Sequence, residues 1–321
     1  MGKVIFTPEE LAQSAVKYRK ELLMMPVFKL GETLQHMTPR YGIRYQEKVG
    51  ELSGDMQLGP YSETRIDDTG VNIKGRTLET YLGSVVKKFS PNSVYQSIYS
   101  DAVTKGESLK KTEITRRVLA FLAGKLGENI HDVMWNAVRN DEGDKTIDLF
   151  DGFDTIALGE IKKGEISKTK GNLYNFSEAI TGVNAVDILK DFYRSANPKL
   201  RKEQTKLFIS HEIYDKYVDD YQASKGPLVY NQSFDKVYLE GSRNRCELVP
   251  LFNKEDSNLI QLTTKRNLLV GFNQRGEEES IVVEKHEAFV LQFIATLFIG
   301  AQYESISPER LLIGKLFTET E

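Results

Sequence analysis

A polar stretch near the N-terminus, residues 38–74, constrains the fold more than any other feature of the chain. It contains five glycines, and its central part, residues 51–68, has few large apolar side chains. A segment this polar cannot bury enough apolar surface to form a core. It must therefore either lie on a partner or remain mobile. Short apolar runs at 43–49 and 71–73 predict a long β-excursion that leads out to a tip and back.

The charge balance excludes a polycation. The 321 residues include 43 Lys and Arg against 46 Asp and Glu, which gives a formal net charge of −3. Sequence-independent binding to phosphate backbones needs a surplus of basic side chains, so nucleic acid is not the expected default ligand. Apolar residues make up 40% of the sequence, as in ordinary folded proteins.

Cysteine content and hydropathy bear on disulfides, export and membrane insertion. Cys246 is the only cysteine, so no intrachain disulfide can form. The first ten residues lack the apolar core of a secretion signal, and we expect neither export nor a lipid anchor. The most apolar run, 288–301, is 14 residues long, shorter than the ~20 residues that cross a bilayer, so no membrane partner is expected.

The first half of the chain carries three helix-like patterns. Thr7 and Pro8 favour the start of a helix that ends before Pro26, and its narrow apolar stripe is typical of an arm that docks elsewhere. Apolar positions in 77–89 have helix-like spacing and are followed by Ser90 and Pro91. The strongest signal, 112–139, predicts one helix of 28 residues and roughly 42 Å.

The second half mixes helices and strands. A helix is predicted from Asn184, a strand at 206–209, and a second helix capped by Ser210. Strands are then expected at the following positions: 237–239, 247–250, 259–263, 268–271, 281–284 and near residue 290. The fold class is therefore α+β.

No catalytic, cofactor or metal residue can be assigned from motifs. The histidines lack a second His or Cys at ligand spacing, although His211-Glu212 and His286-Glu287 each place a carboxylate beside an imidazole. We therefore expect no cofactor and no metal. An acid/base or metal-dependent enzyme that uses His211, Glu212 or His286 remains an alternative of another class, which requires these groups to meet in one cleft.

Three further motifs have ordinary explanations. Residues 70–77 approximate a phosphate-binding loop, but Arg76 replaces its lysine, which favours a Gly-rich β-turn. The Arg-rich surroundings of Cys246 do not make it a nucleophile, and a core thiol is expected. A stripe of tyrosines on the helix after Ser210 could stack on bases, but acidic residues on the same helix favour a core or a subunit interface. These tyrosines are Tyr214, Tyr217 and Tyr221.

The order of these elements resembles the major capsid proteins of tailed bacteriophages, which share the Hong Kong 97 fold with encapsulins. The resemblance spans roughly residues 77–315. It rests on the long helix that leads through Met134-Trp135-Asn136, and on several apolar and turn segments. These segments are Leu149-Phe150-Asp151-Gly152-Phe153, Leu207-Phe208-Ile209-Ser210, Leu248-Val249-Pro250-Leu251, residues 262–271, Gly300-Ala301-Gln302-Tyr303 and Pro308-Glu309.

The resemblance implies a division of the chain into four parts. These are an N-terminal arm at 1–37, an extended β-hairpin E-loop at 38–76, a P-domain at 77–183 and 277–321 with the spine helix at 112–139, and an inserted A-domain at 184–276. Lys48 and Lys74 flank the excursion, but neither can be assigned to the covalent cross-linking known in the founding member.

The function implied by the resemblance is structural rather than enzymatic. A major capsid protein of a tailed phage or prophage assembles into pentamers and hexamers of an icosahedral shell around double-stranded DNA. Its partners would be copies of itself, with a scaffold, a portal and a maturation protease as further candidates, and it would contact packaged DNA non-specifically. The location would be the virion, with assembly in the bacterial cytoplasm. An encapsulin-like compartment that packages an enzyme is the alternative.

Overall fold

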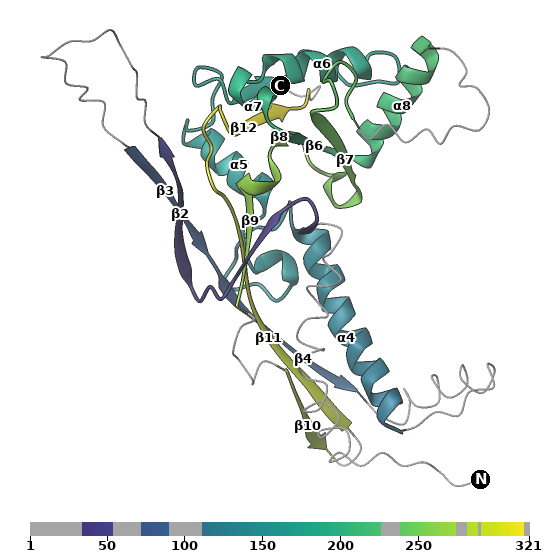
Figure 1. The fold of residues 1–321 in the computed structure, drawn as a ribbon. Helices are drawn as coiled ribbons and strands as arrows, with labels where there is room; N and C mark the ends of the chain where they lie inside the picture. The colour runs from purple at the N-terminus through teal and green to yellow at the C-terminus, as the bar shows by residue number, and fades with distance from the viewer. Residues whose placement is uncertain are drawn as a thin grey trace, which may run out of the picture. The chain divides into compact units, whose positions relative to one another are not determined.

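The structure is a computed structural model that describes residues 34–53, 72–89, 111–225, 238–273, 281–287 and 290–317 (Figure 1). The predicted arm helix, most of the arm and the tip of the excursion lie outside these residues. The chain divides into two compact units. Unit 1 comprises Met1–Tyr45, Thr80–Asp151 and Gly271–Gly300, and unit 2 comprises Gln46–Glu79, Gly152–Val270 and Ala301–Glu321.

One long strand organises unit 1, and two of its neighbours pair with it in antiparallel direction. Its elements are β1 (Thr38–Tyr41), β4 (Tyr81–Phe89), β9 (Leu268–Phe272), β10 (Ile281–Glu287), β11 (Val290–Tyr303), α4 (Lys111–Val133) and η1 (Thr146–Asp148). The strand order is β1-β9-β11-β10, and β4 also pairs with β11. Strands β9 and β11 each continue into unit 2 at one end.

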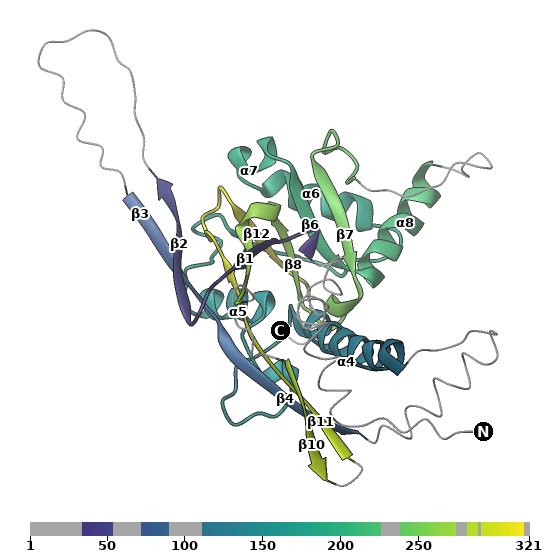
Figure 2. The same ribbon diagram turned by 60° about the horizontal axis from the view of Figure 1, so that its bottom comes forward.

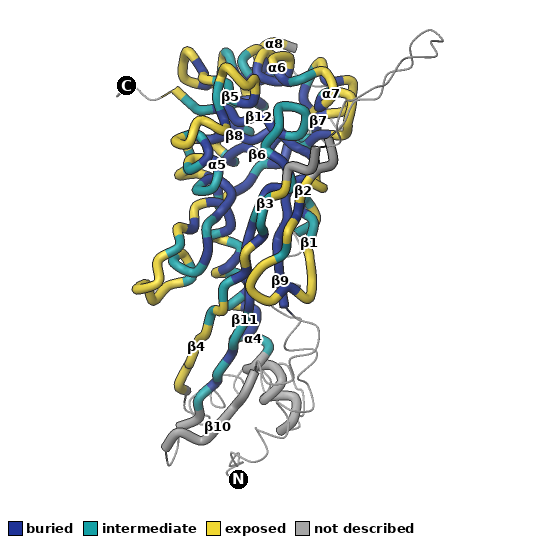
Figure 3. Tube along the Cα trace, turned by 90° about the vertical axis from the view of Figure 1, so that its left-hand side faces the viewer, coloured by how far each residue is buried: buried dark blue, intermediate teal, exposed yellow. Residues whose placement is uncertain are grey.

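Unit 2 is built on a mixed five-stranded sheet in the order β5-β12-β8-β6-β7. Its strands are β5 (Leu173–Asn175), β6 (Thr205–Ser210), β7 (Cys246–Leu251), β8 (Leu259–Thr263) and β12 (Leu311–Lys315). Its helices are α5 (Phe153–Lys162), α6 (Ala185–Ser195), α7 (Pro198–Lys202), α8 (His211–Lys225), η2 (Phe252–Lys254) and η3 (Lys265–Asn267). Every residue of β8 is buried, and Figure 3 shows this buried centre in dark blue.

Close packing against the sheet explains one glycine of unit 2. A Cβ atom on Gly314 of β12 would come within 2.7 Å of Ile260 and Phe176 side-chain atoms and 2.9 Å of Phe192. Phe192 and Phe176 belong to the same apolar core, which also includes Leu189 of α6. Only a residue without a side chain lets α6 and the preceding loop pack this tightly on the sheet.

The excursion forms a hairpin of its own. Strand β2 (Gln46–Ser53) pairs antiparallel with β3 (Asn72–Glu79), from Gln46 opposite Glu79 to Ser53 opposite Asn72. Among the described strands these two pair with each other only, as a separate two-stranded sheet. The prediction of a β-excursion is confirmed for these residues, which belong to unit 2 (Figure 1).

The structure corrects the helix predicted over 77–89. These residues finish β3 and form β4, whose partners in β11 run from Leu291 opposite Phe89 to Ile299 opposite Tyr81. The apolar spacing in this segment fits a helix face as well as a strand. The neighbouring apolar strand satisfies the backbone groups over nine residues, and that tertiary pairing decides the outcome.

The spine helix is also shorter than predicted, because α4 ends at Val133 rather than residue 139. The backbone N–H of Val138 donates to the carbonyl of Ile147 at 2.9 Å, and that of Arg139 donates to a carboxylate oxygen of Asp151 at 2.8 Å. These bonds turn the chain out of the helix. Trp135 lies in the turn that follows and is fully buried.

The remaining expectations are mostly confirmed. The helices from residues 184 and 211 and the strands near 206, 247, 259, 268, 281 and 290 are all present, so the α+β class holds. Within the strand expected at 237–239, Tyr238 forms an isolated bridge with Glu247, and residue 237 lies outside the described part. Sequence patterns did not predict α5, α7, β5 or β12. The division into arm, E-loop, P-domain and A-domain stays a prediction.

Candidate assembly surface at the hairpin

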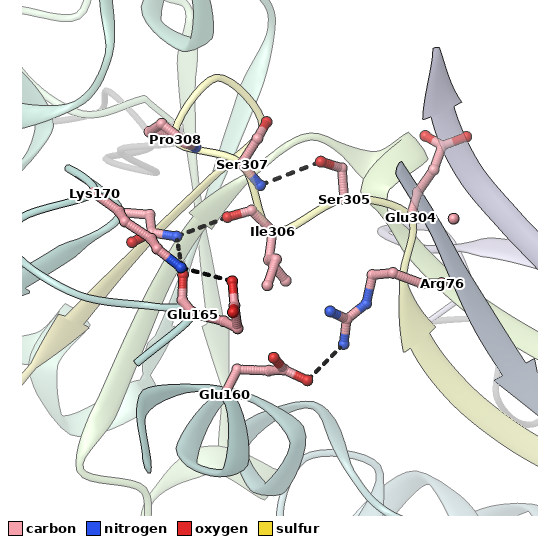
Figure 4. A pocket seen from close by; sticks show the side chains of 11 residues that line it. Arg76, Glu160, Glu165, Lys170, Glu304, Ser305, Ile306, Ser307 and Pro308 are labelled. Atoms are coloured by element: carbon pink, nitrogen blue, oxygen red, sulfur yellow. Dashed lines mark hydrogen bonds and ion pairs between the residues drawn. The ribbon is translucent and has the colours of Figure 1, made fainter. Parts of the chain in front are cut away.

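The base of the β2–β3 hairpin is anchored through one arginine. Arg76 of β3 donates from Nη2 to Oε1 of Glu160 at 3.1 Å and to Oε1 of Gln302 at 3.0 Å. Gln302 in turn donates from Nε2 to the carbonyl of Thr77 at 3.1 Å. The Arg76 and Glu160 side chains are 18% and 11% exposed, so the pair is shielded from solvent. This link joins the hairpin to α5 and to the end of β11 (Figure 4).

A polar pocket of about 510 Å³ lies beside this anchor. Its wall opposite Arg76 is held by Lys170, which pairs with Glu165 at 2.6 Å, and by Asn172, whose Nδ2 donates to the carbonyl of Ile306 at 2.8 Å (Figure 4). The lining residues are Gly75, Arg76, Glu160, Glu165, Lys170, Asn172 and 304–308. Charges of both signs line it, and the base of the hairpin forms one side.

In the part of the hairpin whose side chains are described, residues 46–50 and 75–79, Val49 and Leu78 are the large apolar residues. Val49 of β2 and Leu78 of β3 are buried, whereas Gln46, Lys48 and Gly50 are exposed. An isolated two-stranded hairpin is at best marginally stable in water. Its strands therefore need a further surface to cover them, and this requirement makes the hairpin the candidate functional feature of the chain.

An ion pair in the interior of unit 2 fixes α5, the helix that carries Glu160. Lys254 Nζ lies 2.6 and 2.5 Å from the carboxylate oxygens of Asp154 at the start of α5. Gln261 and Ser257 also donate to this carboxylate, each at 2.6 Å. Burial lowers the pKa of Lys254, and the Asp154 charge opposes that shift. A charge pair so enclosed is strongly sensitive to loss of one partner.

Tyr303 connects this buried pair to the strand that carries Gln302. Its hydroxyl donates to the carbonyl of Phe153 at 2.9 Å and lies 2.8 Å from Oε1 of Gln261. Burial raises the pKa of Tyr303 well above its ordinary value, so the hydroxyl keeps its proton. The interior of unit 2 thus fixes the two elements that Arg76 bridges.

The structure describes the surroundings of His211 and Glu212, two of the residues of the enzyme alternative. His211 begins α8, where its ring stacks on Phe252 with centroids 4.1 Å apart and its Nδ1 lies 3.5 Å from Asp215. Glu212 pairs with Lys216 at 2.7 Å on the exposed side of α8. His286 lies in β10 of unit 1, and its side chain is outside the described part. His211 and Glu212 therefore contact different partners on α8.

The other sequence motifs take structural roles. Cys246 is fully buried and burial raises its pKa to about 12, which confirms the expectation of a core thiol. Tyr217 is buried, with Tyr214 and Tyr221 packed against the same core, so the tyrosine stripe faces inward. Residues 72–77 are an extended strand of the hairpin rather than a phosphate-binding loop.

The described residues also bear on metal sites and membrane spans. No described group of three or more His, Cys, Asp or Glu side chains is placed to hold a metal ion. None of the described helices is long and apolar enough to cross a membrane.

The chain was compared with known proteins at the level of sequence and structure. Its sequence matches no known protein family and no curated protein. Its structure matches the cyanophage A-1(L) capsid with a TM-score of 0.57 and 15% identity, over 92% of this chain and 94% of the other. It matches the procapsid of satellite phage P4 with a TM-score of 0.54 and 10% identity, over 90% and 96% of the chains.

A third match is not a phage protein. The holo-SrpI encapsulin complex of Synechococcus elongatus aligns with a TM-score of 0.51 and 10% identity, over 90% of this chain and 88% of that one. Phage capsids and an encapsulin therefore align along nearly their whole length. The chain has the Hong Kong 97-like fold.

Proposed function

We propose that this chain is a shell-forming structural protein, the major capsid protein of a tailed phage or prophage. Copies would assemble into pentamers and hexamers of an icosahedral shell that encloses double-stranded DNA. The observation that carries the proposal is the β2–β3 hairpin, whose strands pair only with each other among the described strands, within a fold that phage capsids also have. A neighbouring copy supplies the missing cover.

Exposed apolar side chains in unit 1 support this proposal. Leu82 and Val86 lie on one face of β4 and are 54% and 55% exposed, and Phe121 of α4 is 63% exposed. Large apolar side chains gathered on a strand face favour contact with another protein.

The proposal includes the division of the chain into an arm, an E-loop, a P-domain and an A-domain. A scaffold, a portal and a maturation protease would be the accessory partners, and assembly would take place in the host cytoplasm.

Electron microscopy with sedimentation velocity tests the proposal directly. The purified chain should form closed shells or capsomer rings across a range of salt and protein concentrations. A chain that stays monomeric throughout that range would contradict the proposal.

A hairpin variant ties assembly to the feature that carries the argument. Ser53 and Asn72 are directly opposite each other, so residues 54–71 can be replaced by Asn-Gly, which closes a two-residue hairpin turn. We expect this variant to fold, with the near-ultraviolet circular dichroism of the full chain, and to lose shells. Shells that form unchanged would show that the excursion is not an assembly element.

An encapsulin-like compartment is the second candidate, because an encapsulin aligns along 90% of the chain. The two functions differ in their content. Shells purified from the native host should contain nuclease-resistant DNA if the chain is a phage capsid protein. Shells that contain an enzyme and no DNA would favour the compartment.

A further inference from the structure

The parallel strand pair β6–β7 separates two kinds of surface in unit 2. Its register runs from Thr205 opposite Cys246 to Ser210 opposite Leu251. The segments that precede the two strands therefore lie at one end of the pair, and the segments that follow them lie at the other end. Six residues of strand place these ends about 20 Å apart. Figure 2 shows β6 and β7 side by side with α8 next to them.

The end that precedes the strands is basic. The turn before β7 exposes Arg243 and Arg245, and α7 contributes Arg201 before β6. Burial raises the pKa of Tyr193, while the charges of Arg201 and Arg245 oppose that rise, so both guanidinium groups lie near the same ring. Nε of Arg201 is buried and has no hydrogen-bond partner among the described residues. This end of unit 2 carries donors that its described part does not use.

The turn that presents the arginines is held in a defined shape. Ser242 donates from both its backbone N–H and its hydroxyl to the carbonyl of Leu239, at 3.2 and 2.7 Å. Arg243 and Asn244 have φ angles of 55° and 60°, which residues with side chains seldom adopt. Strain of this kind persists where the surrounding structure enforces it, and it is concentrated at functional positions.

The end that follows the strands is aromatic and acidic. Phe252 is 71% exposed and carries the stacked His211 ring, with an interplanar angle of 13°. Tyr214 meets the same imidazole edge-on with centroids 6.1 Å apart. Asp215 and Glu212 are both exposed beside these rings on the first turns of α8. The exposed ring of Phe252 next to carboxylates suits a guanidinium group, which stacks on rings and pairs with carboxylates.

We propose that the basic turn of one copy docks on the aromatic and acidic surface of the next copy. Arg243 and Arg245 would stack on Phe252 and pair with Asp215 of the neighbour. The two surfaces differ and lie at opposite ends of one strand pair, so the contact is head-to-tail, the kind that closes into rings. This inference rests on the proposed shell function and identifies the contact within each ring.

Charge reversal tests the contact from both sides. We expect Arg243→Glu with Arg245→Glu, and separately Glu212→Lys with Asp215→Lys, each to abolish rings and shells in electron micrographs. A chain that carries all four substitutions should regain assembly, because each ion pair between the copies is then reversed in sign. Restored assembly is a result that simple misfolding does not produce.

Matched controls change charge equally elsewhere. Lys125→Glu with Arg194→Glu, and Asp187→Lys with Asp191→Lys, alter exposed side chains of α4 and α6 and should leave assembly intact. If the test variants assemble as well as these controls, the contact is wrong and the shell function stands. If the unchanged chain forms neither rings nor shells, both proposals fail. Loss of packaged nucleic acid with intact rings would assign the arginines to phosphate and overturn the contact.

A disulfide trap locates the contact without relying on charge. In a chain with Arg243→Cys and Phe252→Cys, oxidation should produce a covalent ladder that ends at the ring size, while each single variant gives at most dimers. Cys246 does not interfere, because it is buried and its pKa is raised to about 12. Assembled rings that give no ladder in the double variant would overturn the proposal.

Discussion

The mixed sheet of unit 2 and the β2–β3 hairpin are both built of strands, but they bury their side chains very differently. All five residues of β8 are buried, and β12 and β6 flank it on both sides. In the hairpin, Val49 is the buried residue among 46–50, and β2 and β3 are each other's partners among the described strands. The comparison indicates that the mixed sheet contains its own core, whereas the described part of the hairpin buries few of its side chains.

The largest effect is expected at the buried ion pair. Lys254→Met leaves the Asp154 carboxylate enclosed without its cation, which should lower the free energy of unfolding by about 3–5 kcal/mol. The exposed pair Lys199–Glu309 is the control, and Lys199→Met should cost less than about 1 kcal/mol. Urea unfolding measures both. Equal effects would show that the interior of unit 2 is not as closed as its burial indicates.

The next effect concerns packing on the same sheet. Gly314→Ala forces a methyl group against Ile260, Phe176 and Phe192, and should destabilise unit 2 by about 1–3 kcal/mol. Gly159 of α5 has no atom within 4 Å of an added Cβ, so Gly159→Ala should stabilise the helix by about 0.5–1 kcal/mol. Thermal unfolding should shift in opposite directions for the two variants. A shift of the same sign would contradict the packing argument.

The buried thiol of Cys246 should make the free energy of unfolding fall at alkaline pH. Burial raises the pKa of Cys246 from 9.0 to about 12, so the unfolded chain releases this proton first. The thiol's contribution is fully present below pH 9 and is lost as the pH rises toward 12, by up to about 1.4 kcal/mol per pH unit. Cys246→Ala removes this slope. Between pH 8 and pH 10.5 the urea midpoint of the unchanged chain should therefore fall by more than the midpoint of Cys246→Ala. An equal fall in the two chains would contradict the prediction.

The smallest effect on global stability is expected at the hairpin anchor. Arg76→Met breaks the links to Glu160 and Gln302, yet should change the unfolding of unit 2 by only about 1 kcal/mol. Amide hydrogen exchange in β2 and β3 should accelerate strongly in the unassembled chain. Arg194→Met on α6 is the control and should leave that exchange unchanged. Unaltered exchange in Arg76→Met would mean that apolar contacts at Val49 and Leu78 hold the hairpin without the arginine.

The local sequence pattern was sufficient to predict many elements. It was insufficient where contacts with residues distant in sequence decide the secondary structure. The run Leu207-Phe208-Ile209 and the helix after Ser210 have one interpretation each, and both were predicted correctly. The apolar positions of β4 fit helix and strand alike, and pairing with β11 decided between them. Helix α5 was missed, because its polar Asp154 is buried only through a lysine 100 positions later in the sequence.

The sequence by itself determined that residues 38–74 cannot form a core, that the chain has no disulfide and no motif for catalysis, and that its class is α+β. Those conclusions follow from composition and short-range periodicity, which act through the local chain. Only the tertiary structure decided where α4 ends, which strands pair, and that Arg76 anchors the hairpin through Glu160 and Gln302. These features depend on partners distant in sequence, whose proximity exists only after the chain has folded.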